Sequence, residues 1–174
     1  FEHSNLNRQL LSEEGLIGFS KAQAAKDRVN AINSDVIVNH LAEYVDESNL
    51  YDRIKNGDVV MDCLDSISTR FKLQKAAKKA SIPIVSGAIA GVAGQVTVIF
   101  PGDKGYELIY GKKGGKQSEG VETKTGNIAY CAFLVAALQS SECLKVLLDR
   151  GDILRNKLLI AELWTNTFDI VGLL

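Results

Sequence analysis

Asp58-Val59-Val60-Met61-Asp62-Cys63-Leu64-Asp65-Ser66 is the stretch that decides the fold. Its first part, 58–63, is apolar at the centre, as is typical of a strand that a parallel sheet buries on both faces. A helix is predicted over 66–79, with Asp65 or Ser66 as its cap, because these side chains accept hydrogen bonds from the free N–H groups at a helix start. Ligands of open α/β sheets bind at the carboxyl ends of strands. The turn after this strand is therefore the place to look for a site.

The segments on either side alternate in the same way. Further helices are predicted over 18–32, 47–54 and 127–148, and further strands over 36–41, 83–86, 95–100, 158–163 and 167–171. Helices alternating with strands indicate an α/β sheet with crossover helices. The last two strands flank Thr165-Asn166 and are typical of a hairpin. The predicted fold class is therefore α/β, a Rossmann-like mixed sheet with parallel strands and antiparallel C-terminal strands.

Composition narrows the class of protein and its partners. The 174 residues fit one domain, and a net charge of −1 gives no global attraction to nucleic acid or to an anionic membrane. The longest apolar run, around 128–138, is shorter than the roughly 20 residues of a membrane span. Neither nucleic acid nor a membrane is therefore expected as a partner.

Three cysteines do not indicate a disulfide framework. Cys131 and Cys143 would lie about 18 Å apart along one helix at 1.5 Å per residue, beyond disulfide reach. Cys63 is interpreted as a small core residue of the strand. No CxxC pair is present, so no zinc site is expected. This cysteine usage favours a reducing, cytoplasmic location.

The segment 101–126 differs from the rest, since it carries seven glycines. It is predicted to be a flexible crossover loop, with 106–110 as a brief strand within it. The lysine-rich run 112–116 is interpreted as solvated loop, with a lid over a docked partner's tail as the alternative.

Asp65 is the first candidate for chemistry. A carboxylate at the carboxyl end of a parallel strand can hold Mg²⁺, a hard cation that prefers oxygen ligands and shared phosphate oxygens. The alternative is a helix cap, and the two roles are compatible. Asp62 is the weaker candidate, because side chains alternate along a strand and Asp62 should point the other way.

Two cations lie upstream. Arg8 belongs to the block Ser4-Asn5-Leu6-Asn7-Arg8-Gln9, and Lys21 lies at the start of the helix 18–32. Arg offers a bidentate fork and Lys a compact charge, which are suited to phosphate oxygens. A lone cation is usually a solvated surface residue, but the amides and hydroxyl of this block suit a ribose or phosphate.

Five blocks, in order, resemble the ThiF/MoeB/HesA family, the bacterial relatives of ubiquitin-activating enzymes. They are 4–9 (SNLNRQ), Lys21, 62–66 (DCLDS), 82–88 (IPIVSGA) and 94–98 (GQVTV). The resemblance covers roughly 1–100 well and the helix 127–148 more loosely.

The resemblance implies an ATP-dependent adenylyltransferase. Its acceptor would be the C-terminal glycine carboxylate of a ubiquitin-like sulfur carrier with a Gly-Gly tail, in sulfur transfer of the thiamine or molybdopterin type. By position, Arg8 and Lys21 would neutralise phosphate charge, and Asp65 would hold Mg²⁺. The nucleotide-binding set implied is Ser4, Asn5, Asn7, Arg8, Gln9, Lys21, Asp65 and Ser66. Family members usually pair as homodimers.

The chain also departs from the family pattern. The family's glycine-rich nucleotide loop would lie upstream of Phe1, so 1–174 is interpreted as one ThiF-type domain that is incomplete at its N-terminus. On this reading the polypeptide binds ATP poorly and is inactive alone. Ser66 stands where the family has Asn. Because 101–126 contains no cysteine, adenylation is expected without a covalent enzyme–carrier intermediate there.

Two other readings stay open. One is a non-catalytic scaffold of the same fold that docks a ubiquitin-like protein, favoured by Ser66 and by the cysteine-free loop. The other is a related ATP-dependent enzyme that acts on a peptide or on tRNA, although the net charge argues against tRNA.

Overall fold

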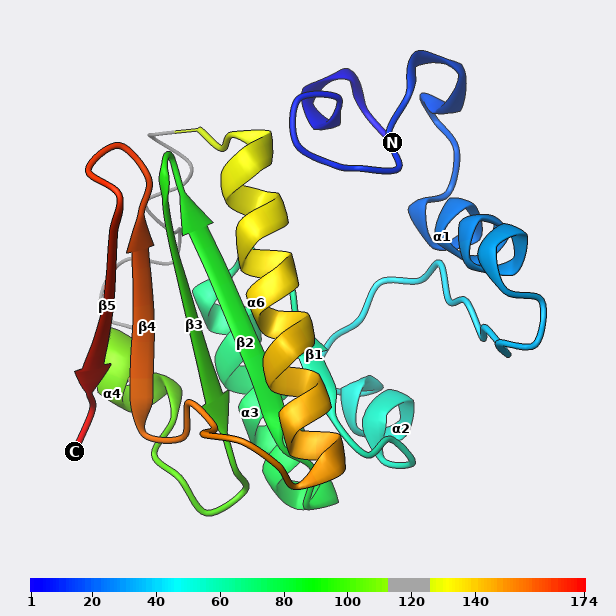
Figure 1. The fold of residues 1–174 in the computed structure, drawn as a ribbon. Coiled ribbons are helices and arrows are strands. Elements are labelled where there is room, and N and C mark those ends of the chain that lie inside the picture. Colours follow the sequence, from blue (N-terminus) through cyan, green and yellow to red (C-terminus); the bar gives the residue numbers. More distant parts are fainter. Residues whose placement is uncertain (113–125) are drawn as a thin grey trace. The chain divides into compact units, whose positions relative to one another are not determined.

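The computed structural model describes residues 1–112 and 126–174 of the chain (Figure 1). These residues form two compact units, Phe1–Tyr44 and Val45–Leu174. Each unit has its own hydrogen bonds.

The first unit consists of short helical segments. It contains the 3-10 helices η1 (His3–Asn5) and η2 (Glu14–Leu16) and the α-helix α1 (Lys21–Ile32). The Ser20 hydroxyl caps α1 by accepting the Gln23 amide N–H at 3.3 Å. The predicted helix is therefore confirmed, and it begins at Lys21 rather than at residue 18.

The predicted strand over 36–41 is wrong. The segment is irregular, and Ile37 is 87% exposed. Within the described residues it has no neighbouring strand, and a strand exists only where its backbone pairs with another. Its apolar run is typical of a strand, but in the described part of the chain its backbone pairs with no other strand.

The second unit is the mixed sheet that the sequence predicts. Its elements are α2 (Leu50–Ile54), β1 (Val60–Asp62), α3 (Ile67–Ala80), β2 (Ile84–Ala90), β3 (Ala93–Ile99), α4 (Tyr106–Tyr110), α6 (Ala129–Leu148), β4 (Lys157–Glu162) and β5 (Thr167–Gly172). The strands lie in the order β1-β2-β3-β4-β5. β1 and β2 are parallel, with α3 as the crossover, and the other neighbours are antiparallel. The predicted C-terminal hairpin is confirmed, with Asn166 in the left-handed conformation of its turn (φ 57°).

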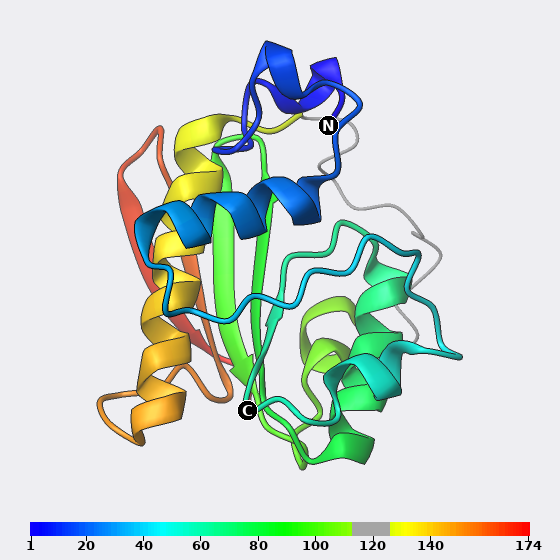
Figure 2. The same cartoon turned by 90° about the vertical axis from the view of Figure 1, so that its right-hand side faces the viewer.

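Helices cover both faces of this sheet. α6 lies along one face, over β2 and β3, and α3 and α4 lie on the other (Figures 1 and 2). Neighbouring residues of one strand serve the two faces, as the period of two requires. Ile84 packs with Leu73 and Tyr106 on the α3 side, and Val85 packs with Val135 on the α6 side.

The segment 106–110 is the helix α4, so the predicted brief strand is wrong. Tyr106 and Tyr110 are four residues apart and therefore lie on one face of a helix. Tyr106 is fully buried against α3 and β2, which gives this short helix its anchor. Residues 113–125, the larger part of the predicted crossover loop, lie outside the described residues, as does most of the lysine-rich run.

α6 approaches the sheet where the sheet has glycines. A Cβ added at Gly87 would overlap the Gln139 side chain and Val135, and one at Gly94 would overlap Val135. This close approach also lets Gln139 Nε2 reach two backbone carbonyl oxygens, of Asp62 at 2.9 Å and of Val85 at 3.2 Å.

We expect Gly87→Ala to lower the free energy of unfolding by about 1–3 kcal/mol, because an extra methyl group in a packed core forces its neighbours to move. Denaturant titration measures this change. Gly102→Ala is the matched control, since a Cβ at Gly102 meets no atom within 4 Å. Equal stability of the two variants would contradict the close packing.

By length and composition α6 alone among the described helices could cross a membrane. It packs along β2 and β3 through Val135 and Leu138. Other apolar side chains of α6, such as Phe133, Leu144 and Leu148, remain exposed.

Candidate functional site

The turn that follows β1 presents Asp65 to solvent. Asp65 is exposed, and its carboxylate makes no hydrogen bond or ion pair with any described residue. Ser66 follows it and caps α3, accepting the Thr69 amide N–H at 3.3 Å. The sequence prediction of a cap at 65 or 66 is therefore resolved in favour of Ser66. The Asp65 carboxylate stays available to a ligand.

The backbone just before Asp65 is held on both sides. The Leu64 amide N–H donates to Asp62 Oδ1 at 2.9 Å. The Leu64 carbonyl oxygen accepts two hydrogen bonds from Arg70, from Nε at 3.2 Å and from Nη2 at 2.5 Å. With Leu64 fixed before it and Ser66 after it, Asp65 has little backbone freedom.

Asp62 is the centre of a buried polar network. It has no exposed surface, and its Oδ2 accepts the hydroxyls of Ser86 at 2.7 Å and of Tyr106 at 2.5 Å. Arg70 Nε lies 3.4 Å from the same oxygen. Burial and the neighbouring Asp62 carboxylate raise the pKa of Tyr106 well above its usual value, so its phenol stays protonated and donates.

Asp62 and Asp65 thus differ in what they offer. The oxygens of Asp62 are already occupied by donors from β2, α3, α4 and the turn, while Asp65 faces solvent. Of these two carboxylates, only that of Asp65 is placed to contact a ligand.

Arg70 is the residue of this region whose role sequence reasoning missed. It is 4% exposed and lies on the buried stripe of α3 with Leu73 and Ala77. Charged residues are seldom fully buried unless they are paired. An arginine at an apolar position of a predicted helix was the signal that could have revealed it.

The block 4–9 of the first unit forms a compact turn. Asn5 is buried, and its side-chain Oδ1 accepts the Glu2 amide N–H at 3.1 Å. The Asn5 carbonyl oxygen accepts the amide N–H groups of Arg8 and Gln9. Arg8 Nη1 donates to the Ser4 carbonyl oxygen and, at 3.0 Å, to Asn7 Oδ1. These local hydrogen bonds hold the block together within the first unit.

Lys21 is the first residue of α1, as the sequence predicts, and its side chain is exposed. The Gly18 amide N–H donates to the Phe1 carbonyl oxygen at 2.8 Å, which ties the segment before α1 to the residues that precede the block 4–9. This hydrogen bond closes the segment 1–18, which contains Arg8, just before α1 begins.

The carboxylates of this region fit one particular mode of magnesium binding. No group of three or more His, Cys, Asp or Glu side chains lies together among residues 1–112 and 126–174. Mg²⁺ is commonly bound through one or two carboxylates plus substrate phosphates and water, rather than by an all-protein cage. The free carboxylate of Asp65 fits this mode of binding.

The cysteines divide between the core and the surface. Cys63 is exposed, so its prediction as a core residue is wrong: β1 ends at Asp62, and Cys63 belongs to the turn that follows. Cys131 is buried and Cys143 packs in the core cluster under α6, which confirms their role in helix packing.

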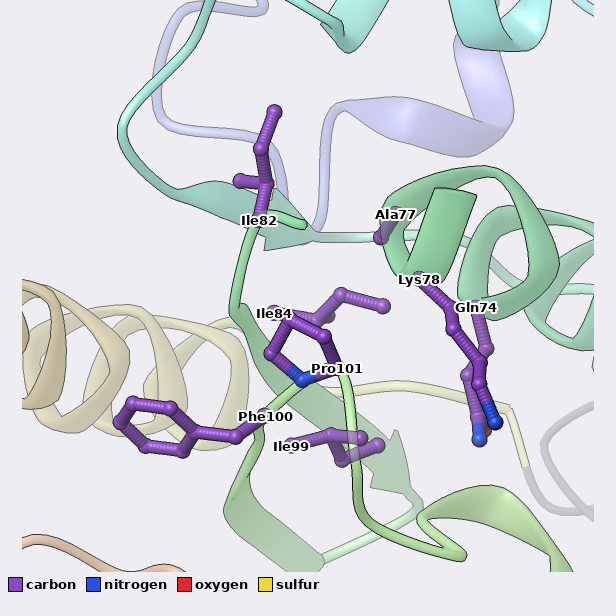
Figure 3. A pocket seen from close by; sticks show the side chains of 8 residues that line it. All are labelled: Gln74, Ala77, Lys78, Ile82, Ile84, Ile99, Phe100 and Pro101. Carbon is purple, nitrogen blue, oxygen red and sulfur yellow. The ribbon is translucent and has the colours of Figure 1, made fainter. Parts of the chain in front are cut away.

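The apolar crevice in Figure 3 is a different feature. It lies at the amino end of β2, whereas the Asp65 turn follows the carboxyl end of β1. It leaves no enclosed room even for a water molecule, whereas ligand pockets are cavities of several hundred Å³. It is lined by Gln74, Ala77, Lys78, Ile82, Ile84, Ile99, Phe100 and Pro101.

Comparison with known proteins identifies the family to which this chain belongs. The ThiF family model matches residues 1–173. The chain therefore belongs to the ThiF family, and the resemblance found in its sequence is confirmed. It is 32% identical over 170 residues to the SAMP-activating enzyme E1 of Haloferax volcanii, and 29% identical over 167 residues to the molybdopterin-synthase adenylyltransferase of Escherichia coli.

The chain corresponds to part of these relatives. The two alignments cover 98% and 95% of this chain but 63% and 66% of the relatives. Among solved structures, Escherichia coli MccB with ATP aligns over 99% of this chain and 54% of its own, with a TM-score of 0.80 and 20% sequence identity. This similarity confirms the Rossmann-type α/β fold.

Proposed function

We propose that the protein catalyses ATP-dependent adenylation of the C-terminal glycine carboxylate of a ubiquitin-like carrier protein. The observation that carries the proposal is the free Asp65 carboxylate, held on a fixed turn at the carboxyl end of β1 in a ThiF-family chain. The names of the two sequence relatives, an activating enzyme and an adenylyltransferase, support the class of reaction.

In the reaction, a carboxylate oxygen of the carrier attacks the α-phosphorus of ATP. The bond from that phosphorus to the bridging oxygen breaks, and pyrophosphate leaves with its electron pair. Arg8 and Lys21 neutralise the charge that spreads over the phosphate oxygens. Ser4, Asn5, Asn7, Gln9 and Ser66 contact the nucleotide through their amide and hydroxyl groups.

Asp65 is the residue that would hold Mg²⁺. When bound, the ion neutralises phosphate charge and orients the triphosphate. The protein's own contribution is the fixed turn, because a carboxylate that need not be ordered on binding loses less entropy.

Three further parts complete the proposal. The pathway is sulfur transfer of the thiamine or molybdopterin type, and the location is the cytoplasm. Two chains pair as a homodimer, for which the apolar side chains exposed on and beside α6 suit an interface. Among these, Ile128 is 39% and Phe133 43% exposed.

Exchange of labelled pyrophosphate into ATP tests the proposal, with the full-length gene product and candidate ubiquitin-like carriers from the same genome. We expect exchange that depends on a carrier with an intact C-terminal glycine. A protein that binds a carrier but supports no exchange would favour the scaffold reading instead. Exchange that a short peptide or tRNA drives, and that no carrier drives, would favour a related ATP-dependent enzyme that acts on a peptide or on tRNA.

Lys21→Ala and Arg8→Ala are each expected to lower kcat/KM for ATP by about 10- to 100-fold, because a hydrogen bond to a charged group contributes about 1.5–3 kcal/mol. Initial rates of exchange over a range of ATP concentrations give this value. Arg28→Ala, an exposed cation further along α1, is the matched control. If Lys21→Ala and Arg28→Ala behave alike, Lys21 is a surface residue.

A further inference from the structure

We infer that Arg70 is a positioning residue for the metal-binding carboxylate of Asp65. The inference rests on the proposed function, since it concerns the same turn. Arg70 does not reach solvent and would not touch the substrate. It acts through the backbone that carries Asp65.

The guanidinium group of Arg70 donates hydrogen bonds to both the turn and the sheet. Nε and Nη2 both donate to the Leu64 carbonyl oxygen, and Nη2 also donates to the Gly87 carbonyl oxygen of β2 at 2.9 Å. The planar guanidinium therefore bridges the residue just before Asp65 to β2, the strand next to β1. A lysine has one nitrogen at the end of a flexible stem and cannot reproduce this fork.

The third nitrogen of Arg70 connects the turn to α4. Nη1 donates to the Tyr110 hydroxyl at 2.7 Å, and Gln95 Nε2 donates to the same oxygen at 3.1 Å. At the other end of α4, Tyr106 donates to Asp62, which in turn holds the Leu64 amide. Both backbone groups of Leu64 are thus tied to α4 through one intermediate side chain each.

The test compares Arg70→Lys with Arg155→Lys in the full-length protein. Arg155 has a half-exposed side chain that pairs with Asp103 and makes no contact with the turn. Binding of Mn²⁺ in the presence of the ATP analogue AMPCPP is measured by the loss of the free Mn²⁺ electron paramagnetic resonance signal. We expect about 10-fold weaker Mn²⁺ binding for Arg70→Lys, the low end of what loss of an outer-sphere support costs a metal site. We expect no change for Arg155→Lys.

A double-mutant cycle separates positioning from general weakening of the fold. Carrier-dependent exchange is measured for Asp65→Ala, Arg70→Lys and the double variant. If Arg70 acts through Asp65, Arg70→Lys lowers kcat about 10-fold in the parent and has no further effect beside Asp65→Ala. Equal losses in both backgrounds, or unchanged Mn²⁺ binding by Arg70→Lys, would overturn the inference.

Tyr110→Phe keeps the test decisive if Arg70→Lys does not fold. It removes the hydroxyl that accepts from Nη1 and leaves Arg70 in place, and we expect Mn²⁺ binding about 3-fold weaker. Unchanged binding in this variant would overturn the inference. Failure of the proposed function has a different signature, because the parent protein itself would then show no carrier-dependent exchange.

Discussion

Asp65→Ala is expected to lower carrier-dependent pyrophosphate exchange by about 100- to 1,000-fold, the range seen when one group that stabilises transition-state charge is removed. The carboxylate is exposed and unpaired within the described part of the chain, so its loss should leave the fold unchanged. The thermal unfolding midpoint should therefore match that of the parent. Initial rates at saturating ATP and Mg²⁺ measure the effect on kcat.

Asp58→Ala is the matched control for this prediction. Asp58 is also an exposed carboxylate, but it precedes β1 rather than following it. Its replacement is expected to leave exchange unchanged. A folded Asp65→Ala protein with near-parent turnover would remove Asp65 from the mechanism, whatever the control shows.

The sheet could be predicted from the sequence because its strands carry their own signals. The apolar centre of 58–63 and the Asn166 turn each specify local structure that the fold then keeps. The local sequence does not specify the structure of the segments 36–41 and 106–110. The first has strand-like side chains but no partner, and the second is too short to be stable without the burial of Tyr106. Their structure depends on tertiary contacts that a local pattern does not contain.

The candidate site could be predicted only in its outer part. The positions of Asp65 and Ser66 follow from where the strand ends and the helix begins. The buried hydrogen bonds that support them cannot be predicted in this way, because Tyr106 and Ser86 reach Asp62 from 44 and 24 residues away. Such long-range contacts leave only indirect traces in a sequence, such as the arginine on the apolar stripe of α3.

Asp62→Ala is expected to destabilise the second unit by about 3–5 kcal/mol. The Arg70 guanidinium would remain buried with its ion-pair partner gone, and breaking one side of a buried pair typically costs this much. The hydroxyls of Ser86 and Tyr106 would also lose their shared acceptor. Urea titration, followed by circular dichroism, measures the change in free energy of unfolding.

Asp52→Ala is the control for this measurement, because Asp52 pairs with Lys55 at the exposed surface of α2. Surface pairs contribute little to stability, so this variant should unfold near the parent's midpoint. Asp62→Asn should fall between the two, since an amide keeps one oxygen acceptor for the hydroxyls but loses the charge that balances Arg70. If Asp62→Ala proved as stable as Asp52→Ala, the buried network would not hold the turn, and the rigidity attributed to Asp65 would lose its structural basis.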